Sequence, residues 1–238
     1  MHSDKILTTE EIKTGQLFLM DKPLHWTSFQ VVKKMRGILK NRYGFRKIKV
    51  GHAGTLDPLA TGLLLICAGK FTKKIPEFQG QQKRYTGTFE MGATTPSFDR
   101  ETEIDQRFPT DHLNPEILKN AAEKLTGEIE QRPPIFSALK KDGKRLYDYA
   151  RKGEEVEIKT RKVQVDSFDI TKTDLPEVHF DIRCGKGTYI RSMANDFGKL
   201  ADSGAHLKSL RRTEIGEYSV DDALDIEGFE KLLPPKKE

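Results

Sequence analysis

One segment of twelve residues, Gly51–Gly62 (GHAGTLDPLATG), constrains the backbone more tightly than any other part of the chain. Three of the twelve residues are glycine and one is Pro58, and these residue types allow or enforce backbone angles that other residues avoid. The segment therefore predicts irregular backbone rather than a regular helix or strand. The apolar run Gly62–Ala68 follows directly, and because it is too short for a helix it predicts a buried strand.

The remaining hydrophobic patterns are short and of mixed type. Strands are predicted at 16–22, 62–68, 83–91, 163–170 and 178–184 and from 214, and helices from 27 or 28 to about 39, from 114 to about 127, and at 146–151 and 189–201. Strands and helices do not alternate regularly, which argues against a parallel α/β architecture. The sequence predicts an α+β fold with a mixed, mostly antiparallel central sheet that is flanked by helices and loops.

Charge is unevenly distributed along the chain. Lys and Arg number 41 against 36 Asp and Glu, and the segment Val31–Lys49 holds eight basic residues and no acidic one. Acidic residues predominate in 99–130 and 214–238. This separation predicts one positive face, which suits a polyanion such as a phosphate backbone. A solvated helix flank next to a basic loop is the other interpretation of the same pattern.

Several classes of protein find no support in the sequence. The cysteines, Cys67 and Cys184, and the six scattered histidines show no disulfide framework and no spacing typical of metal ligands. No glycine-rich nucleotide motif occurs, so we expect neither a metal nor a cofactor. No apolar run is long enough to cross a bilayer, and the N-terminus lacks the apolar core of a secretory signal. We therefore expect a cytoplasmic protein with no membrane association.

A single carboxylate, Asp57, lies at the centre of the constrained loop. A rigid loop that precedes a buried strand is a suitable base for presenting one reactive group. An Asp-Pro turn, in which Asp57 bonds its own backbone, explains the same residues without any chemistry. The local pattern alone leaves both interpretations open.

A wider resemblance bears on this choice. The segment GHAGTLDPLATGLL resembles the catalytic motif of the TruB family, the tRNA pseudouridine synthases that modify the T-loop uridine at position 55 of tRNA. Further segments resemble other motifs of the family, in the family's order: MDKP at 20–23, KRY at 83–85, QRPPIFSALK at 131–140, CGKGTYIR at 184–191 and GAHLKSLRR at 204–212. Such an ordered set, spread over roughly residues 16–220, is far more specific than one short pattern.

The resemblance implies a pseudouridine synthase fold and an isomerisation that needs no cofactor or metal. Asp57 matches the nucleophile, and whether it attacks C1′ or C6 or assists a glycal route stays open. Arg191 matches the charge partner of this carboxylate, although an arginine on the helix at 189–201 could equally lie on the surface. Tyr85 matches the tyrosine that stacks on the flipped uracil and is a candidate for proton transfer. Its alternation with Phe89 is also compatible with an ordinary core tyrosine.

Two residues of the first motifs match positions near the substrate. By the resemblance, His52 assists RNA binding beside the nucleophile, although a lone histidine in a glycine-rich loop is usually structural. Lys22 matches a lysine near the pocket, where it would help to order the strand of Tyr85.

Three residues of later motifs also match family positions. Tyr189 and Leu210 match residues that line the uracil pocket, and Leu210 could as well belong to the core. Asp99 matches a carboxylate that pairs with the catalytic arginine, Arg191. At this point the sequence departs from the family, because Pro96 stands where an aspartate is usual.

The resemblance also assigns a surface for the T arm of tRNA. The basic run from Lys33 to Lys49 would contact phosphates, and its leading candidates are Arg42, Arg46, Lys47 and Lys49. The segment at about 131–151 matches the family's RNA-gripping insertion, with Lys140, Lys141, Lys144 and Arg145 facing phosphate.

The predicted organisation is a catalytic domain at 1–212 and a short acidic segment at 213–238. The second segment is too short for the C-terminal PUA domain that family members commonly carry. We expect a monomer that acts on tRNA without a protein partner.

Two other classes of function remain as alternatives. One is a catalytically idle RNA-binding or tRNA-folding protein on the same scaffold, and the presence of both Asp57 and Arg191 argues against it. The other is a phosphotransferase with an aspartate nucleophile, which would need further carboxylates to hold Mg²⁺. The loop Gly51–Gly62 contains only Asp57, so this reading has the weakest support.

Overall fold

A computed structural model describes residues 6–137, 139–141, 143–154 and 156–235. The chain folds as two compact units. Unit 1 is formed by Met1–Lys83 together with Arg211–Glu238, and unit 2 by Arg84–Leu210. The strand β12 (Ala205–Ile215) contributes its first part to unit 2 and its last part to unit 1.

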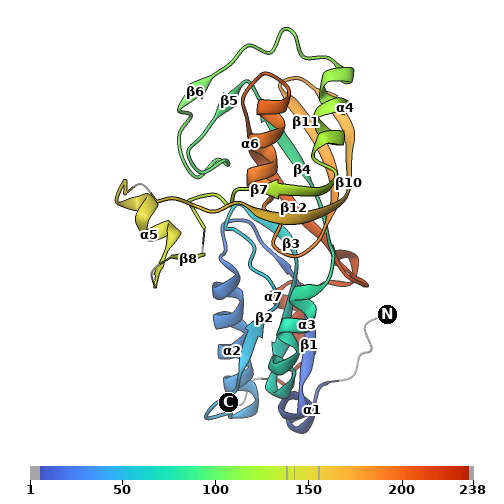
Figure 1. The fold of residues 1–238 in the computed structure, drawn as a ribbon. Coiled ribbons are helices and arrows are strands. Elements are labelled where there is room, and N and C mark those ends of the chain that lie inside the picture. The colour runs from blue at the N-terminus through green and yellow to red at the C-terminus, as the bar shows by residue number, and fades with distance from the viewer. Residues whose placement is uncertain (1–5, 138, 142, 155, 236–238) are drawn as a thin grey trace. The chain divides into compact units, whose positions relative to one another are not determined.

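Unit 1 combines a small antiparallel sheet with short helices (Figure 1). Its strands β1 and β2 both pair antiparallel with β3, and β12 pairs with β13. Residue Ala68 of β3 has Gln16 and Val50 as its partners on its two sides. The elements are α1 (Thr9–Thr14), β1 (Gln16–Lys22), α2 (Ser28–Tyr43), β2 (Val50–His52), β3 (Ala60–Ala68), the 3-10 helix η1 (Gly69–Lys74), α3 (Ile75–Gly80), β13 (Tyr218–Ser219), the 3-10 helix η2 (Val220–Asp222) and α7 (Ile226–Lys231).

The helix α2 covers one side of this sheet. It begins after Thr27, whose hydroxyl accepts a hydrogen bond from the backbone of Gln30 while the Gln30 side chain bonds the Thr27 backbone, which is a capping box. Apolar side chains recur at the spacing of a single helix face, so they enter one core together. This core contains Val31, Val32, Met35 and Leu39 of α2, Phe18 and Met20 of β1, Leu64 and Ile66 of β3, and Phe229 of α7.

Unit 2 is built around a second run of paired strands in the order β12-β4-β11-β10-β7 (Figure 1). The strand β10 pairs antiparallel with both β11 and β7, and two bulges interrupt its register with β11. The elements are β4 (Lys83–Met91), β5 (Ala93–Thr94), β6 (Gln106–Arg107), α4 (Pro115–Lys124), β7 (Gly127–Gln131), β8 (Lys140–Lys141), β9 (Lys144–Arg145), α5 (Leu146–Arg151), β10 (Arg161–Asp174), β11 (Glu177–Cys184) and α6 (Ile190–Leu200).

Four phenylalanines hold α6 against the strands of unit 2. Phe197 of α6 contacts the rings of Phe89 and Phe168 at centroid distances of 5.5 and 5.4 Å, and Phe180 lies 4.3 Å from Phe89. Aromatic pairs at these distances add to the free energy gained by burying the rings. This cluster fixes the helix that begins with two predicted site residues, Tyr189 and Arg191.

Three departures from the sequence prediction have a clear physical reason. The helix α2 runs to Tyr43 rather than to about Leu39, and it ends at Gly44, which has the left-handed conformation (φ 68°) typical of a helix end. The segment predicted to be irregular contains a short strand, Val50–His52, because β3 offers it an edge. The strand predicted from Glu214 is β12, which begins nine residues earlier at Ala205, since charged side chains mask its pattern.

A substitution at Phe229 can test whether α7 packs into the core of unit 1. Its ring is fully buried and meets Phe18 edge to face at 5.0 Å, whereas Phe29 of α2 is 61% exposed. Replacing Phe229 by Ala is expected to lower the free energy of unfolding by about 3–5 kcal/mol, because it removes buried apolar surface and leaves a cavity.

The matched variant Phe29→Ala should change stability by no more than about 0.5 kcal/mol. Urea unfolding of both variants provides the comparison. Equal losses would contradict the assignment of α7 to the core.

Candidate active site

The loop that carries Asp57 is held from its N-terminal side by the start of α2. The hydroxyl of Ser28 donates to the carbonyl of Leu56 at 3.1 Å and accepts from the N–H of Leu56 at 2.8 Å. Ser28 and Leu56 are both buried, and Asp57, the next residue, is partly exposed. The N–H of Ala60 donates to the Asp57 carbonyl at 3.1 Å and closes the turn. The backbone at the candidate nucleophile is therefore fixed at a residue that stays partly exposed.

A buried arginine from β12 holds both ends of the same loop. Arg212 is only 1% exposed, and its Nε donates to the Leu63 carbonyl at 2.8 Å while an Nη donates to the Gly54 carbonyl at 3.1 Å. Gly62 has a φ of 103°, and a Cβ at this position would collide with the backbone of Arg212. The motif thus requires glycine where β12 passes closest to the loop.

Lys22 also contacts this loop. Its buried ammonium donates to the carbonyls of Pro23 at 2.9 Å, Trp26 at 2.6 Å and Pro58 at 3.5 Å. Burial lowers the pKa of Lys22 to about 8, although the nearby Asp57 carboxylate acts in the opposite direction. The ammonium therefore stays mostly protonated at pH 7 and places a positive charge near Asp57.

His52 precedes the loop on β2. Burial and the positive charge of Arg212 lower the pKa of His52 below its ordinary value of 6.5, so the ring is neutral at pH 7. Within the described part of the chain, its buried Nδ1 has no hydrogen-bond partner. In unit 1, Lys22 thus lies close to Asp57, and Lys22 and His52 both lie close to Arg212.

In unit 2 the structure brings Arg191 and Asp99 together. Arg191 lies in the first turn of α6, is 4% exposed, and approaches the Asp99 carboxylate at 3.6 Å. Its Nη1 also donates to the carbonyl of Ser97 at 3.3 Å. Asp99 accepts hydrogen bonds from the Ser97 hydroxyl at 2.6 Å and from the N–H of Glu101 at 2.9 Å. This geometry matches the pairing that the resemblance implies, even with Pro96 in the preceding loop.

Tyr189 is held in place by two residues that sequence reasoning did not single out. The fully buried amide of Gln131 donates to the Tyr189 carbonyl at 3.1 Å and accepts from the Tyr189 N–H at 2.7 Å. The guanidinium of Arg161 lies 4.8 Å from the centre of the tyrosine ring, a cation–π contact. In the sequence, Gln131 stands out only as the first residue of the motif at 131–140, and no motif or hydrophobic pattern marks Arg161.

The last two predicted site residues, Tyr85 and Leu210, also belong to unit 2. Tyr85 of β4 is 9% exposed and alternates with the buried Phe89, as the period of two predicts. Leu210 of β12 is half-buried. Gly87, between Tyr85 and Phe89, is required because a Cβ there would collide with the Ser209 carbonyl and the Phe180 ring.

Comparison with known proteins decides the family. Residues 40–190 match the N-terminal domain of the TruB family of pseudouridylate synthases. The chain belongs to the TruB family.

Two relatives show how far the similarity to TruB proteins extends. The tRNA pseudouridine synthase B of Flavobacterium johnsoniae is 60% identical over 95% of this chain and 100% of its own length. The protein of the same name from Phocaeicola vulgatus is 51% identical over 93% of this chain and 94% of its own length. The chain is accordingly a pseudouridine synthase, as the sequence predicted.

Solved structures confirm the predicted pseudouridine synthase fold. A chain of a Cbf5-Nop10-Gar1 complex superimposes with a TM-score of 0.68 at 24% identity, covering 95% of this chain and 61% of that one. A chain of an H/ACA RNP bound to a substrate RNA containing 2′-deoxyuridine gives a TM-score of 0.65 at 23% identity, over 91% and 52%. The TruB chain therefore spans between half and two thirds of these longer chains, and the likeness concerns the fold.

The basic residues predicted to contact phosphate differ in how they are engaged. Arg42 donates to the Glu230 carboxylate at 2.8 Å and to the Pro234 carbonyl at 3.0 Å, and its side chain is 12% exposed. Arg46, Lys47 and Lys49 are exposed. Arg42 thus ties α2 to the C-terminal segment, whereas the other three extend into solvent.

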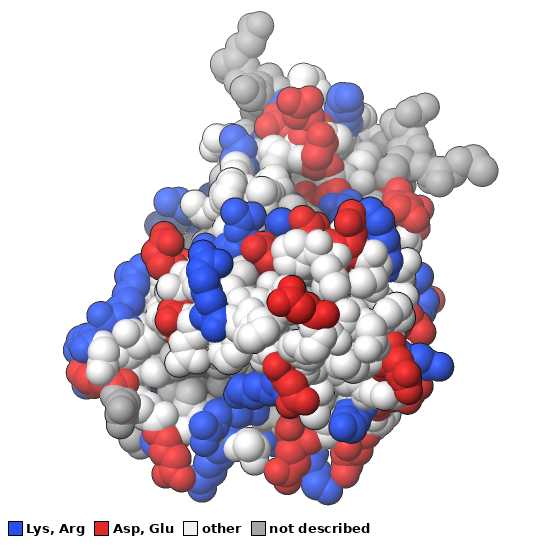
Figure 2. All heavy atoms as spheres, turned by 90° about the horizontal axis from the view of Figure 1, so that it is seen from above, with Lys and Arg blue, Asp and Glu red and all other residues white. Residues whose placement is uncertain are grey.

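In the predicted RNA-gripping insertion, the basic side chains that the structure describes have local contacts. Lys141 donates to the Glu157 carbonyl at 2.8 Å, and Lys144 lies 5.9 Å from the centre of the Tyr149 ring. The side chains of Lys140 and Arg145 lie outside the described residues. On the face of the molecule in Figure 2, basic and acidic side chains are interspersed rather than separated.

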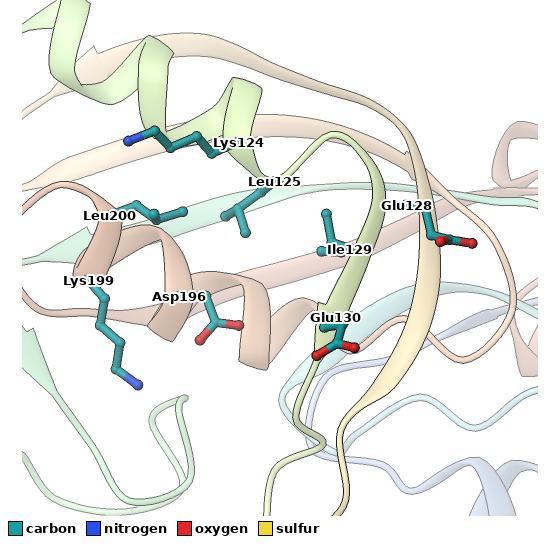
Figure 3. Close-up of a pocket in the computed structure, with 8 residues that line it drawn as sticks. All are labelled: Lys124, Leu125, Glu128, Ile129, Glu130, Asp196, Lys199 and Leu200. Carbon is teal, nitrogen blue, oxygen red and sulfur yellow. The ribbon is translucent and has the colours of Figure 1, made fainter.

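A pocket of about 490 Å³ in unit 2 contains none of the predicted site residues (Figure 3). It has an apolar part and charged groups of both signs, which favours no single class of ligand. Burial raises the pKa of Asp196 in its wall. Its lining residues are Lys124, Leu125, Glu128, Ile129, Glu130, Asp196, Lys199 and Leu200.

In the described part of the chain, no group of three or more His, Cys, Asp or Glu residues is arranged to hold a metal ion. None of the helices in that part has the length and apolar character needed to cross a membrane.

The pKa of Lys22 gives a testable pH dependence. Folding lowers this pKa from 10.5 to about 8, so between these values the unfolded chain binds more protons and the free energy of unfolding rises with pH. From pH 7 to pH 10, wild type should gain on the order of 2 kcal/mol over the variant Lys22→Met, which lacks the titrating group.

Urea unfolding at several pH values measures this difference. In an Asp57→Asn background the gain should begin at lower pH, because the carboxylate that raises the pKa of Lys22 is gone. A difference between wild type and Lys22→Met that does not change with pH would contradict the assignment.

The role of Gln131 is tested by removing its polar atoms. The variant Gln131→Met keeps the length of the side chain but leaves the N–H and C=O of Tyr189 without this partner, and we expect a loss of about 2–4 kcal/mol in unfolding free energy. Gln164→Met, at an exposed position of β10, is the matched control and should be neutral within about 0.5 kcal/mol. Similar losses in both variants would show that Gln131 does not anchor Tyr189.

Proposed function

We propose that this enzyme converts uridine to pseudouridine in the T loop of tRNA, at position 55, with Asp57 as the nucleophile. The observation that carries the proposal is the Asp57 loop, whose backbone is fixed by Ser28, Lys22 and Arg212 from three separate segments. The relatives that match nearly the whole chain are named tRNA pseudouridine synthase B, which supports tRNA as the substrate.

The reaction is an isomerisation of the nucleotide. The N1–C1′ bond breaks, the uracil turns within the pocket, a C5–C1′ bond forms, and the hydrogen leaves C5 as a proton while N1 gains one. A nucleophilic carboxylate keeps the separated fragments together through a covalent intermediate, formed at C1′ or at C6, or assists a glycal route. All of these routes need one ionised carboxylate in a fixed position.

Lys22 supports the ionised form of the nucleophile. Its ammonium, held by three carbonyls, brings a positive charge close to the Asp57 carboxylate. An opposite charge within a few ångströms favours the charged form of an acid. Because the pKa of Lys22 is about 8, this support is present at neutral pH and declines in alkaline solution.

The residues of unit 2 are assigned to binding of the flipped base. A uridine in a folded loop must leave its stack before it can react, and an aromatic side chain then replaces the lost stacking. We assign this role to Tyr85, whose hydroxyl is a candidate to receive the C5 proton. Tyr189 and Leu210 are assigned to the uracil pocket.

Arg191 is assigned as the cationic partner of the reacting groups. The buried Asp99 carboxylate approaches the guanidinium from one side, and the Ser97 carbonyl accepts a hydrogen bond from its Nη1, so the side chain is held in position. Asp99 therefore acts through Arg191 and is a positioning residue.

Binding of the T arm is assigned to unit 1. Arg46, Lys47 and Lys49 are exposed and can contact phosphates directly, and the neutral His52 can donate one hydrogen bond to the RNA. Arg42 would have to leave Glu230 to do the same. The proposal includes action as a monomer, without a protein partner or an added cofactor.

The proposal is tested by mapping pseudouridine on an unmodified tRNA transcript incubated with the protein alone. Wild type should convert the T-loop uridine, and Asp57→Asn should convert it at least about 1,000-fold more slowly, because it removes the nucleophile but keeps the size of the side chain. A nearly unchanged rate in Asp57→Asn would refute the assigned nucleophile. Salt-dependent binding of tRNA by wild type without any conversion would instead favour an idle RNA-binding protein.

A further inference from the structure

A groove of about 420 Å³ lies along α2 in unit 1, apart from the residues assigned to the reaction. It is open at Gly37, where an added Cβ would have nothing within 4 Å. The residues that line it come from α2 and from the turn before this helix: Trp26, Gln30, Lys33, Lys34, Gly37, Ile38 and Asn41.

The charge of this groove has one sign. The helix Ser28–Tyr43 contains five basic residues and no acidic one. Lys33 and Lys34 are exposed, and neither forms an ion pair with a described residue, in contrast to Arg42 near the end of the same helix. Two free ammonium groups beside each other on an acid-free helix are suited to phosphate.

The groove also offers an aromatic surface. Trp26 packs its indole partly against the core of unit 1, and its carbonyl accepts the hydrogen bond from Lys22 at 2.6 Å, so the residue is held in place. An aromatic ring beside basic side chains is the combination with which proteins bind unpaired nucleotides, the base stacking on the ring and the phosphates meeting the cations.

We propose that the α2 groove, defined by these seven residues, binds a looped or single-stranded segment of the substrate RNA. One unpaired base stacks on Trp26, and its flanking phosphates contact Lys33 and Lys34. This inference rests on the proposed function for the identity of the RNA, and it adds a binding surface to the exposed residues Arg46, Lys47 and Lys49. Gly37 leaves room for the strand to approach the helix.

A pair of glycine variants tests the occupancy of the groove. Gly37→Glu places a carboxylate in its centre, and the open space around Gly37 means that the fold need not shift. Gly80→Glu is the matched control. Gly80 ends another helix of unit 1 and also has open space around it, and its replacement by Glu changes the net charge by the same amount.

Binding is measured with an unmodified tRNA transcript in an Asp57→Asn background, so that turnover does not interfere. We expect Gly37→Glu to weaken binding by about tenfold or more relative to Gly80→Glu, because the new charge repels phosphate. Equal affinities of the two variants would overturn the proposal.

Two further readouts test the individual contacts. In Lys33→Gln/Lys34→Gln, the slope of log affinity against log salt concentration should become shallower by about 1.5, since two phosphate contacts are lost. Trp26 is the only tryptophan of the chain, so its fluorescence reports on the groove without any substitution. We expect tRNA to quench this emission and to protect it from iodide.

These outcomes are independent of the test of catalysis. If wild type forms pseudouridine while the salt slope and the Trp26 emission do not respond, the proposed function stands and the groove proposal fails. If an acidic peptide quenches Trp26 as strongly as tRNA does, and tRNA does not compete with it, the groove takes a protein partner and the proposal also fails.

Discussion

The buried guanidinium of Arg212 is the interaction on which the candidate active loop most depends. Removing a charged group from water costs several kcal/mol unless hydrogen bonds replace its hydration. Arg212 recovers them from the carbonyls of Leu63 and Gly54, which belong to the two ends of the segment around Asp57. The geometry of the loop is thus set by a residue that lies 149 positions after Leu63 in the chain.

The same charge affects its neighbours. Burial lowers the pKa of Lys22 and of His52, and the charge of Arg212 lowers both further, so the three groups cannot all be protonated without cost. His52 becomes neutral, and Lys22 remains charged at neutral pH with the help of the Asp57 carboxylate. Lys22 and Arg212 thus hold two fixed cations against carbonyls of the loop that carries Asp57, and the imidazole of His52 beside them is neutral. This electrostatic arrangement follows from burial and would not arise in a flexible, solvated loop.

Much of the fold could be predicted from the sequence, and the reasons for the misses are physical. The strand β4 and the helices α4 and α6 followed from strong local periodicity and from caps such as Asn114. The start of β12 was missed because partners distant in sequence neutralise its charged side chains, as Glu177 does for Lys208 and Asp21 for Arg211. Arg212, Gln131 and Arg161 were missed as individual residues for the same reason, since their role exists only once β12, β7 and β10 are folded. The motifs point to the positions that we propose do the chemistry, whereas the residues that hold them are visible only in the structure.

The basic run at 33–49 shows that the number of basic residues in a segment differs from the number that can contact a phosphate. Arg42 has the same formal charge as Lys33, yet its guanidinium is engaged with Glu230 and Pro234 and stabilises the packing of the C-terminal segment. Only the residues whose cations remain in solvent can release counterions when they meet a phosphate backbone. The run therefore divides into a structural part and an exposed part, and the exposed lysines of α2 lie beside the only tryptophan of the chain. Because stacking and charge act together on an unpaired nucleotide, this coincidence of residues is better suited to a loop of RNA than to a regular duplex.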